Sequence, residues 1–359
     1  MIAGAIILTF FVSIALKQKT VSETQLSADF FKQFELAVSG ITAMQDKQLL
    51  FQIPSMDLRY DCTTDCYCGA YAGTRAKPVS GKIFELDNRI TFSPGRLKGN
   101  YLLTWSLSWE YPYRITNFFI MTSPEVKYLI EDTPRGREIY ENLPPKTMII
   151  NFGEPPQRAI DKQLFNNTPT TPLSSLNVAG NYKVKFIFTK TESDPSKYDI
   201  TALKSLPNAD VTAIKLIPKS AQSPEQVIFY KKNSSATLKE SGKTYILGDA
   251  SRFGAVFAED FNSYSCMMNK ASRILSGVSD VLATKNDLYL EISSNPTYSQ
   301  KDCGIHYGSS PYRSLSASAS TVDFFKVSSA EDIRGMDKNI LSIAYQNEQA
   351  LQSSCPQIY

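Results

Sequence analysis

The N-terminal segment constrains this chain most, because it is apolar enough for a membrane. Residues 1–16 (MIAGAIILTFFVSIAL) carry no charge, and Lys17 and Lys19 end the run. A full span needs about 20 apolar residues, whereas a cleaved secretory signal starts with a basic segment and ends at a small-residue cleavage site. The run fits neither pattern fully, and we interpret residues 1–16 as an uncleaved anchor in a lipid bilayer. We explain the missing basic flank in one of two ways: Met1 is a late start, or a short basic leader has been removed ahead of it.

The residues behind the anchor continue with an amphipathic pattern. No proline intervenes before Pro54, and apolar side chains recur at helical spacing at Leu26, Phe30, Phe34, Val38 and Ile41. One helix running from the membrane into a stalk explains this pattern, and so does an anchor followed by a separate core helix. Both assign residues 1–50 to a membrane anchor and stalk, and a helix of this kind can also self-assemble.

Six cysteines indicate which side of the membrane the chain faces. They are Cys62, Cys66, Cys68, Cys266, Cys303 and Cys355. The first three lack the paired Cys-x2-Cys spacing typical of zinc sites, so we favour disulfides over a metal. Disulfides place the bulk of the chain in an extracellular compartment. This outweighs the basic residues after the anchor, which by themselves favour a cytoplasmic location.

Connectivity does not follow from the spacing, because six cysteines allow many pairings. Cys266 and Cys355 lie at the ends of two expected helices, which favours links from these positions to the early cluster or to Cys303. Sequons for glycosylation occur at Asn166 and Asn233, in polar stretches that read as loops. They agree with a single-pass protein of the cell membrane, or with an extracellular filament.

Composition excludes several classes of protein. The 359 residues are 42% hydrophobic and 20% charged, which is typical of a folded chain. The net charge of +3, without basic runs, argues against a nucleic-acid partner. The sequence has one histidine and no phosphate-binding, nucleophile-elbow or metal-loop motif, and so predicts no cofactor.

The remaining pattern predicts an α/β fold in two further parts. Residues 51–114 carry the cysteine cluster and a β-rich module, with a strand over residues 101–109. Residues 115–359 alternate strands and helices, which predicts a mixed, partly parallel sheet with flanking helices. Expected strands there cover 115–121, 126–130, 147–151, 182–189, 211–217 and 255–257, and expected helices cover 136–143, 157–165 and 199–206. Residues 227–230 and 244–247 suggest a hairpin.

Two C-terminal helices complete the expected fold. In the first, Met267, Ala271, Ile274, Leu275, Val278, Val281 and Leu282 share one face and are assigned to the core. Residues 307–321 are rich in serine and read as a loop. A capping box at residues 329–332 then starts a last helix.

Few residues suggest chemistry. His306 follows Cys303 at a spacing that permits a nucleophile and a base, but disulfide bonding of Cys303 is the better reading, so we assign no catalytic residue. Asp260 falls between an expected strand and a helix, where α/β sheets place ligand-binding carboxylates, although it also suits a helix N-terminus.

An aromatic cluster offers the other candidate binding site. Trp105 and Trp109 share one face of an expected strand and read as core. Tyr111 and Tyr113 are the expected exposed pair, which fits contact with a glycan or a protein partner.

These residues carry two resemblances. Residues 1–45 resemble the stem of type IV pilin-like proteins, which implies an apolar half that anchors the precursor and later lies in a filament core; Ala5 stands where bacterial members have glutamate. A longer stretch resembles single-span archaeal surface proteins, a type that implies no activity. That resemblance rests on Cys62, Pro94, Trp105, Trp109, Asn117 and the terminal residues 354–359 (SCPQIY).

We therefore expect a membrane-anchored envelope protein that acts in structure or assembly, as in a pilin-like filament subunit. The first alternative is a monomeric surface protein that binds a glycan or a protein. The second is an extracytoplasmic hydrolase that uses His306 or Asp260.

Overall fold

The computed structural model describes most of the chain behind the N-terminal segment. The described residues are Lys32, Phe34, Glu35, Gly40, 46–53, 57–74, 77–78, 83–86, 89–150, 155–166, 178, 180–221, 223–295, 301–326 and 330–359. Among them, no helix combines the length and the hydropathy that a bilayer span requires. The expected anchor, residues 1–16, lies outside this part of the chain. Phe34, from the expected amphipathic helix, is helical and buried, with its ring edge-on to Phe84 at 5.3 Å.

The first part of the fold is β-rich, as expected. One four-stranded sheet has the strand order β1-β8-β9-β6. A five-stranded antiparallel sheet of shorter strands has the order β4-β3-β2-β7, with β5 also paired to β3. The expected boundary between residues 114 and 115 falls inside β9, directly after its first residue, and β9 pairs with β8 as a hairpin. The strands are β1 (Gln48–Gln52), β2 (Leu58–Cys62), β3 (Cys68–Thr74), β4 (Lys77–Pro78), β5 (Phe84–Glu85), β6 (Ile90–Phe92), β7 (Arg96–Leu97), β8 (Tyr101–Glu110) and β9 (Arg114–Thr122).

A six-stranded mixed sheet follows, with the order β13-β10-β14-β15-β16-β17. The first four strands are parallel and the last two form the expected antiparallel hairpin. Every residue of β10 and β14 is buried, because core clusters cover both faces of the sheet. The strands are β10 (Val126–Glu131), β13 (Asp161–Phe165), β14 (Lys183–Phe188), β15 (Val211–Ile217), β16 (Gln226–Lys232) and β17 (Leu238–Tyr245).

Short elements connect these strands. Helix α2 (Pro134–Asn142) confirms the helix expected at residues 136–143, and the helix expected at 199–206 reduces to the 3-10 turn η3 (Thr201–Leu203). The helix expected at residues 157–165 is wrong. Residues there form β12 (Gln157–Arg158), which pairs with β11 (Thr147–Met148), and then β13, whose pairing to β10 overrides the local helical pattern. Two further 3-10 turns are η2 (Pro195–Lys197) and η4 (Asn208–Asp210).

Helix α3 (Gly248–Phe257) lies between the two larger sheets. The ring of Phe257 contacts Trp105 of β8 at 6.3 Å and Tyr128 of β10 at 5.2 Å between ring centroids. Trp105 and Trp109 are buried, which confirms their assignment to the core. The strand expected at residues 255–257 is wrong, because this short apolar run is the last turn of a buried helix.

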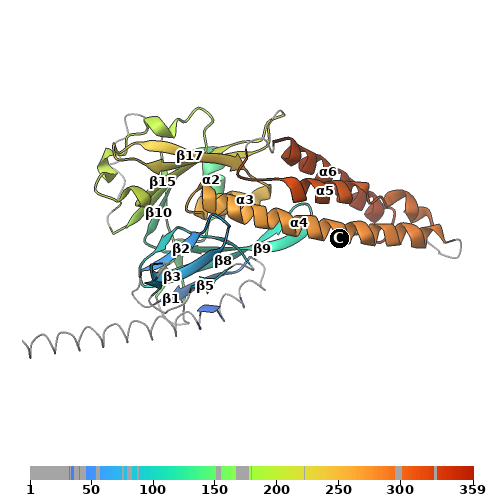
Figure 1. Ribbon diagram of the computed structural model, residues 1–359, viewed down its shortest axis with the longest axis horizontal. Helices are drawn as coiled ribbons and strands as arrows, with labels where there is room; N and C mark the ends of the chain where they lie inside the picture. The colour runs from blue at the N-terminus through green and yellow to red at the C-terminus, as the bar shows by residue number, and fades with distance from the viewer. Residues whose placement is uncertain are drawn as a thin grey trace, which may run out of the picture.

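A helical bundle projects to one side of the sheets (Figure 1). It consists of α4 (Phe261–Ser294), η5 (Lys301–His306), α5 (Ser310–Thr321) and α6 (Ala330–Gln352). At 34 residues, α4 is about 50 Å long. The loop expected at residues 307–321 is wrong, since Tyr312, Leu315 and Ala319 form the buried face of α5. The core face expected for α4 is partly wrong, because Ile274 and Val281 are exposed.

Three disulfides join the parts. Cys62 bonds Cys68 within the small sheet, Cys66 bonds Cys266 on α4, and Cys303 bonds Cys355 at the distal end of the bundle. The last two confirm the favoured links from the helix ends. In the chain-entropy model, closing 200 residues with Cys66–Cys266 stabilises the fold by about 5 kcal/mol.

Candidate functional site

The expected exposed pair, Tyr111 and Tyr113, is buried instead. Their side chains are 8% and 4% exposed, because the turn after β8 folds back against the bundle. The hydroxyl of Tyr111 donates to Asp337 of α6, and the hydroxyl of Tyr113 shares a hydrogen bond with Ser279 of α4. Burial raises the pKa of both hydroxyls. These tyrosines attach the hairpin to the bundle and present no aromatic surface.

Asp260 caps α4. Its Oδ1 accepts from the backbone N–H of Ser263 at 2.9 Å in a capping box, and its Oδ2 pairs with Lys231 at 2.8 Å. Burial raises the pKa of Asp260, but the hydrogen bond from Lys231 and the N–H of Ser263 outweigh burial and hold the pKa below its ordinary value. Each carboxylate oxygen therefore has a structural role.

Two other expectations concern the cysteines and the sequons. Cys303 is bonded to Cys355, and a disulfide sulfur cannot act as the nucleophile that His306 would activate. Asn166 is exposed directly after β13. Asn233 is half-buried, and its amide oxygen accepts two backbone N–H groups of the β16–β17 turn at 3.0 Å each. Glycosylation of Asn166 and Asn233 stays a prediction.

The carboxyl ends of β10 and β14 form the topological switch point of the parallel strands. The chain leaves β10 towards β13 and leaves β14 towards β15, which lie on opposite sides, and α/β sheets bind ligands in such crevices. Here the side chain of Glu131 fills the crevice. Its carboxylate accepts the N–H groups of Thr189 and Lys190 at 2.6 and 2.8 Å and the hydroxyl of Ser193 at 2.5 Å. The Glu131 carboxylate therefore occupies the place in which a ligand would bind at this switch point.

Buried lysines brace the junction between β14 and the helices. Lys183 pairs with Glu259 at 2.8 Å, and Glu259 accepts the N–H of Gly95 at 2.6 Å. The amine of Lys185 donates to the carbonyls of Ala255, at 3.1 Å, and Ala258, at the end of α3. Burial lowers the pKa of Lys185 to about 7. A lysine there satisfies carbonyls that a helix C-terminus leaves unbonded.

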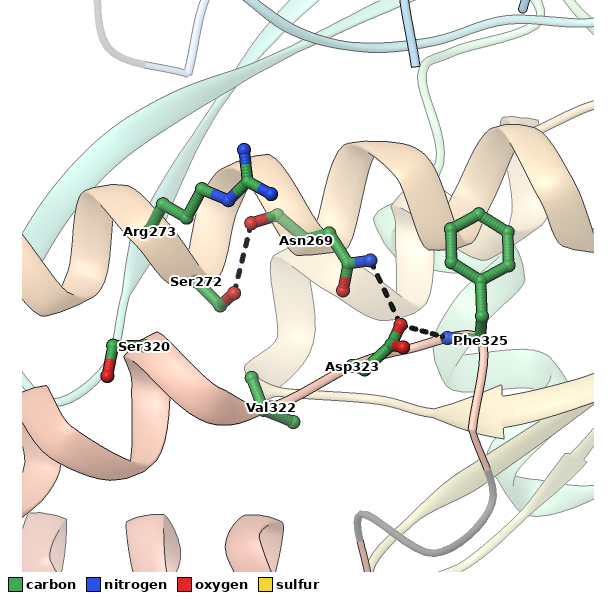
Figure 2. Close-up of a pocket in the computed structure, with 7 residues that line it drawn as sticks. All are labelled: Asn269, Ser272, Arg273, Ser320, Val322, Asp323 and Phe325. Atoms are coloured by element: carbon green, nitrogen blue, oxygen red, sulfur yellow. Dashed lines mark hydrogen bonds between the residues drawn. The ribbon is translucent and has the colours of Figure 1, made fainter. Parts of the chain in front are cut away.

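The accessible candidate site lies on α4, where two cavities share part of their lining. Figure 2 shows the smaller of the two. One, of about 270 Å³, is lined by Asn269, Ser272, Arg273, Ser320, Val322, Asp323 and Phe325. The other, of about 450 Å³, is lined by Thr64, Asp65, Cys66, Tyr67, Cys266, Asn269, Lys270 and Arg273. They share Asn269 and Arg273, and we call the two together the α4 groove.

Hydrogen bonds fix one wall of the α4 groove (Figure 2). The amide of Asn269 donates to Asp323 at 3.2 Å and accepts the N–H of Phe324 at 2.9 Å. Asp323 also accepts the N–H of Phe325 at 3.0 Å. Burial raises the pKa of Asp323, but these hydrogen bonds and Lys326 lower it more. The turn after α5 is therefore held against α4.

A disulfide fixes the other wall. Cys66–Cys266 ties the loop between β2 and β3 to α4, and Tyr67 beside it is 60% exposed. Arg273 is exposed and makes no hydrogen bond or ion pair with any residue that the structure describes. A guanidinium near hydroxyls and an aromatic ring suits a ligand that carries a carboxylate.

The sequence contained only a faint signal for this groove. Lys270 and Arg273 are spaced for one helix face, and Tyr67 adjoins the cysteine cluster, but the turn after α5 was not expected to meet them. Among the described residues no group of acidic, histidine or cysteine side chains is arranged to hold a metal ion. No family model, curated protein or solved structure matches this chain.

Proposed function

We propose that this protein is an extracytoplasmic protein of the cell envelope, held at the membrane by residues 1–16, that acts by assembly rather than by catalysis. The pairing of all six cysteines carries the proposal. Disulfides persist in oxidising compartments, and two of these bridges join segments 200 and 52 residues apart. The bundle that projects from the sheets supports a role in contact with other molecules.

Mass spectrometry of the native protein, purified from membranes without reductant, tests this proposal. We expect a mature chain that retains the apolar segment, with the three bridges intact. Sugars at Asn166 or Asn233 would add support, and reduction should shift the mass by six hydrogens. Six free thiols in the protein taken from living cells, or a mature chain without the apolar segment, would refute it. Purified surface filaments that lack the chain would exclude the pilin-like form of assembly.

The α4 groove supports a second candidate function, which is binding of a carboxylate-bearing surface glycan. Arg273 supplies a guanidinium that is unpaired within the described residues, and Tyr67 supplies an exposed ring for stacking. Binding of the full chain to acidic glycans should fall at least tenfold in R273A. The matched control is R59A, because Arg59 is also exposed and without a partner in the described chain. Equal binding by the two variants would remove this candidate.

A further inference from the structure

The middle of α4 leaves a stripe of its surface uncovered. Ile274, Val281 and Leu288 recur every seven residues and are 37%, 67% and 53% exposed. Gly277 and Thr284 alternate with them and are exposed too. Residues at this spacing follow one side of a helix, and this stretch is about 21 Å long. Figure 1 shows this part of α4 along the margin of the molecule, with the end of the β8–β9 hairpin packed against one side of it.

Gly277 is unusual within this stripe. Glycine lowers helix propensity more than any residue except proline, yet Gly277 lies in the middle of the longest described helix. Apart from its chain neighbours and the backbone of its own helix, no described atom lies within 4 Å of the position that a Cβ would take there. Contacts within the described chain therefore give no reason for glycine, whereas a second helix lying against the stripe could approach most closely at this residue.

The stripe has the same pattern in both directions. Apolar residues lie at its two ends and its centre, and small residues lie between them. A two-fold axis near Val281 places Ile274 opposite Leu288 of a second copy and Gly277 within one residue of Thr284. Two-fold interfaces require such self-complementary surfaces. We propose that α4 pairs antiparallel with α4 of a second copy of this chain.

Charges beside the stripe support this orientation. The same axis brings Arg273, which is unpaired in the described chain, next to Asp287 of the other copy, and it does so twice. Asp287 is partly exposed and interacts with Ser309 and Arg313 of its own chain, so an arginine of the second copy would add to this cluster. Asp280 instead approaches its own symmetry mate. This single like-charge contact predicts that D280N strengthens the pairing.

This inference deepens the proposed assembly role and rests on it, but it does not depend on the anchor. Association through residues 1–16 would be insensitive to changes on α4. Variants of α4 therefore separate the two modes of assembly within one full-length protein in detergent.

Sedimentation of the full chain over a micromolar concentration series tests the pairing. We expect a monomer–dimer equilibrium whose dissociation constant rises at least tenfold in V281D and falls in D280N. The matched control is L341D, because Leu341 is 70% exposed but lies on α6, and its dissociation constant should stay within twofold of the parent.

Cross-linking provides a readout that does not depend on stability. Residue 281 lies near the proposed axis, and all native cysteines are paired, so V281C should form a disulfide-linked dimer under mild oxidation while L341C should not. A monomer at every concentration, a dimer equally weakened by V281D and L341D, or V281C that fails to cross-link would each overturn the pairing. None of these results would alter the disulfide pattern on which the proposed function rests.

Discussion

The buried amine of Lys185 predicts a specific pH dependence of stability. Its side chain is 2% exposed and donates to two carbonyls at the end of α3. Burial lowers its pKa from 10.5 to about 7. Between these values the unfolded chain binds a proton that the folded chain does not, so stability rises with pH through this window. The folded protein is least favoured below pH 7, where Lys185 is charged in both states.

The magnitude follows from the two pKa values. From pH 6 to pH 9, the Lys185 contribution to the free energy of unfolding grows by about 2.5 kcal/mol. Lys185→Met keeps most of the length of the side chain and abolishes its titration, so the variant lacks this rise. Lys162 is a graded comparison, because burial and the nearby charge of Lys146 lower its pKa to about 8. The Lys162 contribution to the free energy of unfolding grows by less, about 1.4 kcal/mol over the same pH range, and Lys162→Met should lose this increase.

Urea unfolding of the parent and both variants at pH 6, 7, 8 and 9 measures these quantities. The stability difference between the parent and Lys185→Met should grow with pH, and it should grow more than the difference for Lys162→Met. A difference that does not change with pH would show that Lys185 is not neutralised by burial. A larger change with pH for Lys162→Met than for Lys185→Met would refute the expectation that burial lowers the pKa of Lys185 more than that of Lys162.

Three further perturbations have expected magnitudes. Replacing Cys66 and Cys266 together by alanine should lower the free energy of unfolding by up to about 5 kcal/mol in urea denaturation, and no loss would contradict the chain-entropy argument. Glu131→Gln should cost about 2–4 kcal/mol in the same assay, because an amide cannot accept all three hydrogen bonds; an unchanged midpoint would mean that the crevice repacks. Gly254→Ala should lower the melting midpoint through a loss of about 1–3 kcal/mol, because a Cβ there would meet the ring of Phe92 at 2.8 Å, and a stabilised variant would exclude this close contact.

The sequence predicts those elements in which a periodic pattern extends over many residues or in which the whole element is buried. Strands β8, β9, β10, β14 and β15 are confirmed, since each reads as an apolar or alternating run. The predictions for residues 157–165 and 255–257 are wrong because the short patterns there suit a strand or a helix equally. Pairing to β10 decides the first, and burial between two sheets decides the second. The serine-rich composition of α5 concealed its buried face.

The candidate sites were harder to predict, because they depend on how distant segments meet. Spacing placed Tyr111 and Tyr113 on the surface, but it held no information that the bundle would fold over them. Likewise, helical spacing predicts one core face for seven apolar residues of α4, although Ile274 and Val281 are exposed. The chemistry of Asp260 was predicted better, since a helix N-terminus was one of the two roles assigned to it.

The Cys66–Cys266 bridge also determines how the protein would respond to a pull. Tension applied between the segment before β1 and the distal bundle would follow the shortest covalent route, which crosses from residue 66 to residue 266. Residues 67–265, with the six-stranded sheet, would carry none of it. The load therefore passes through the disulfide, and the by-passed residues can stay folded while the rest of the chain is under tension.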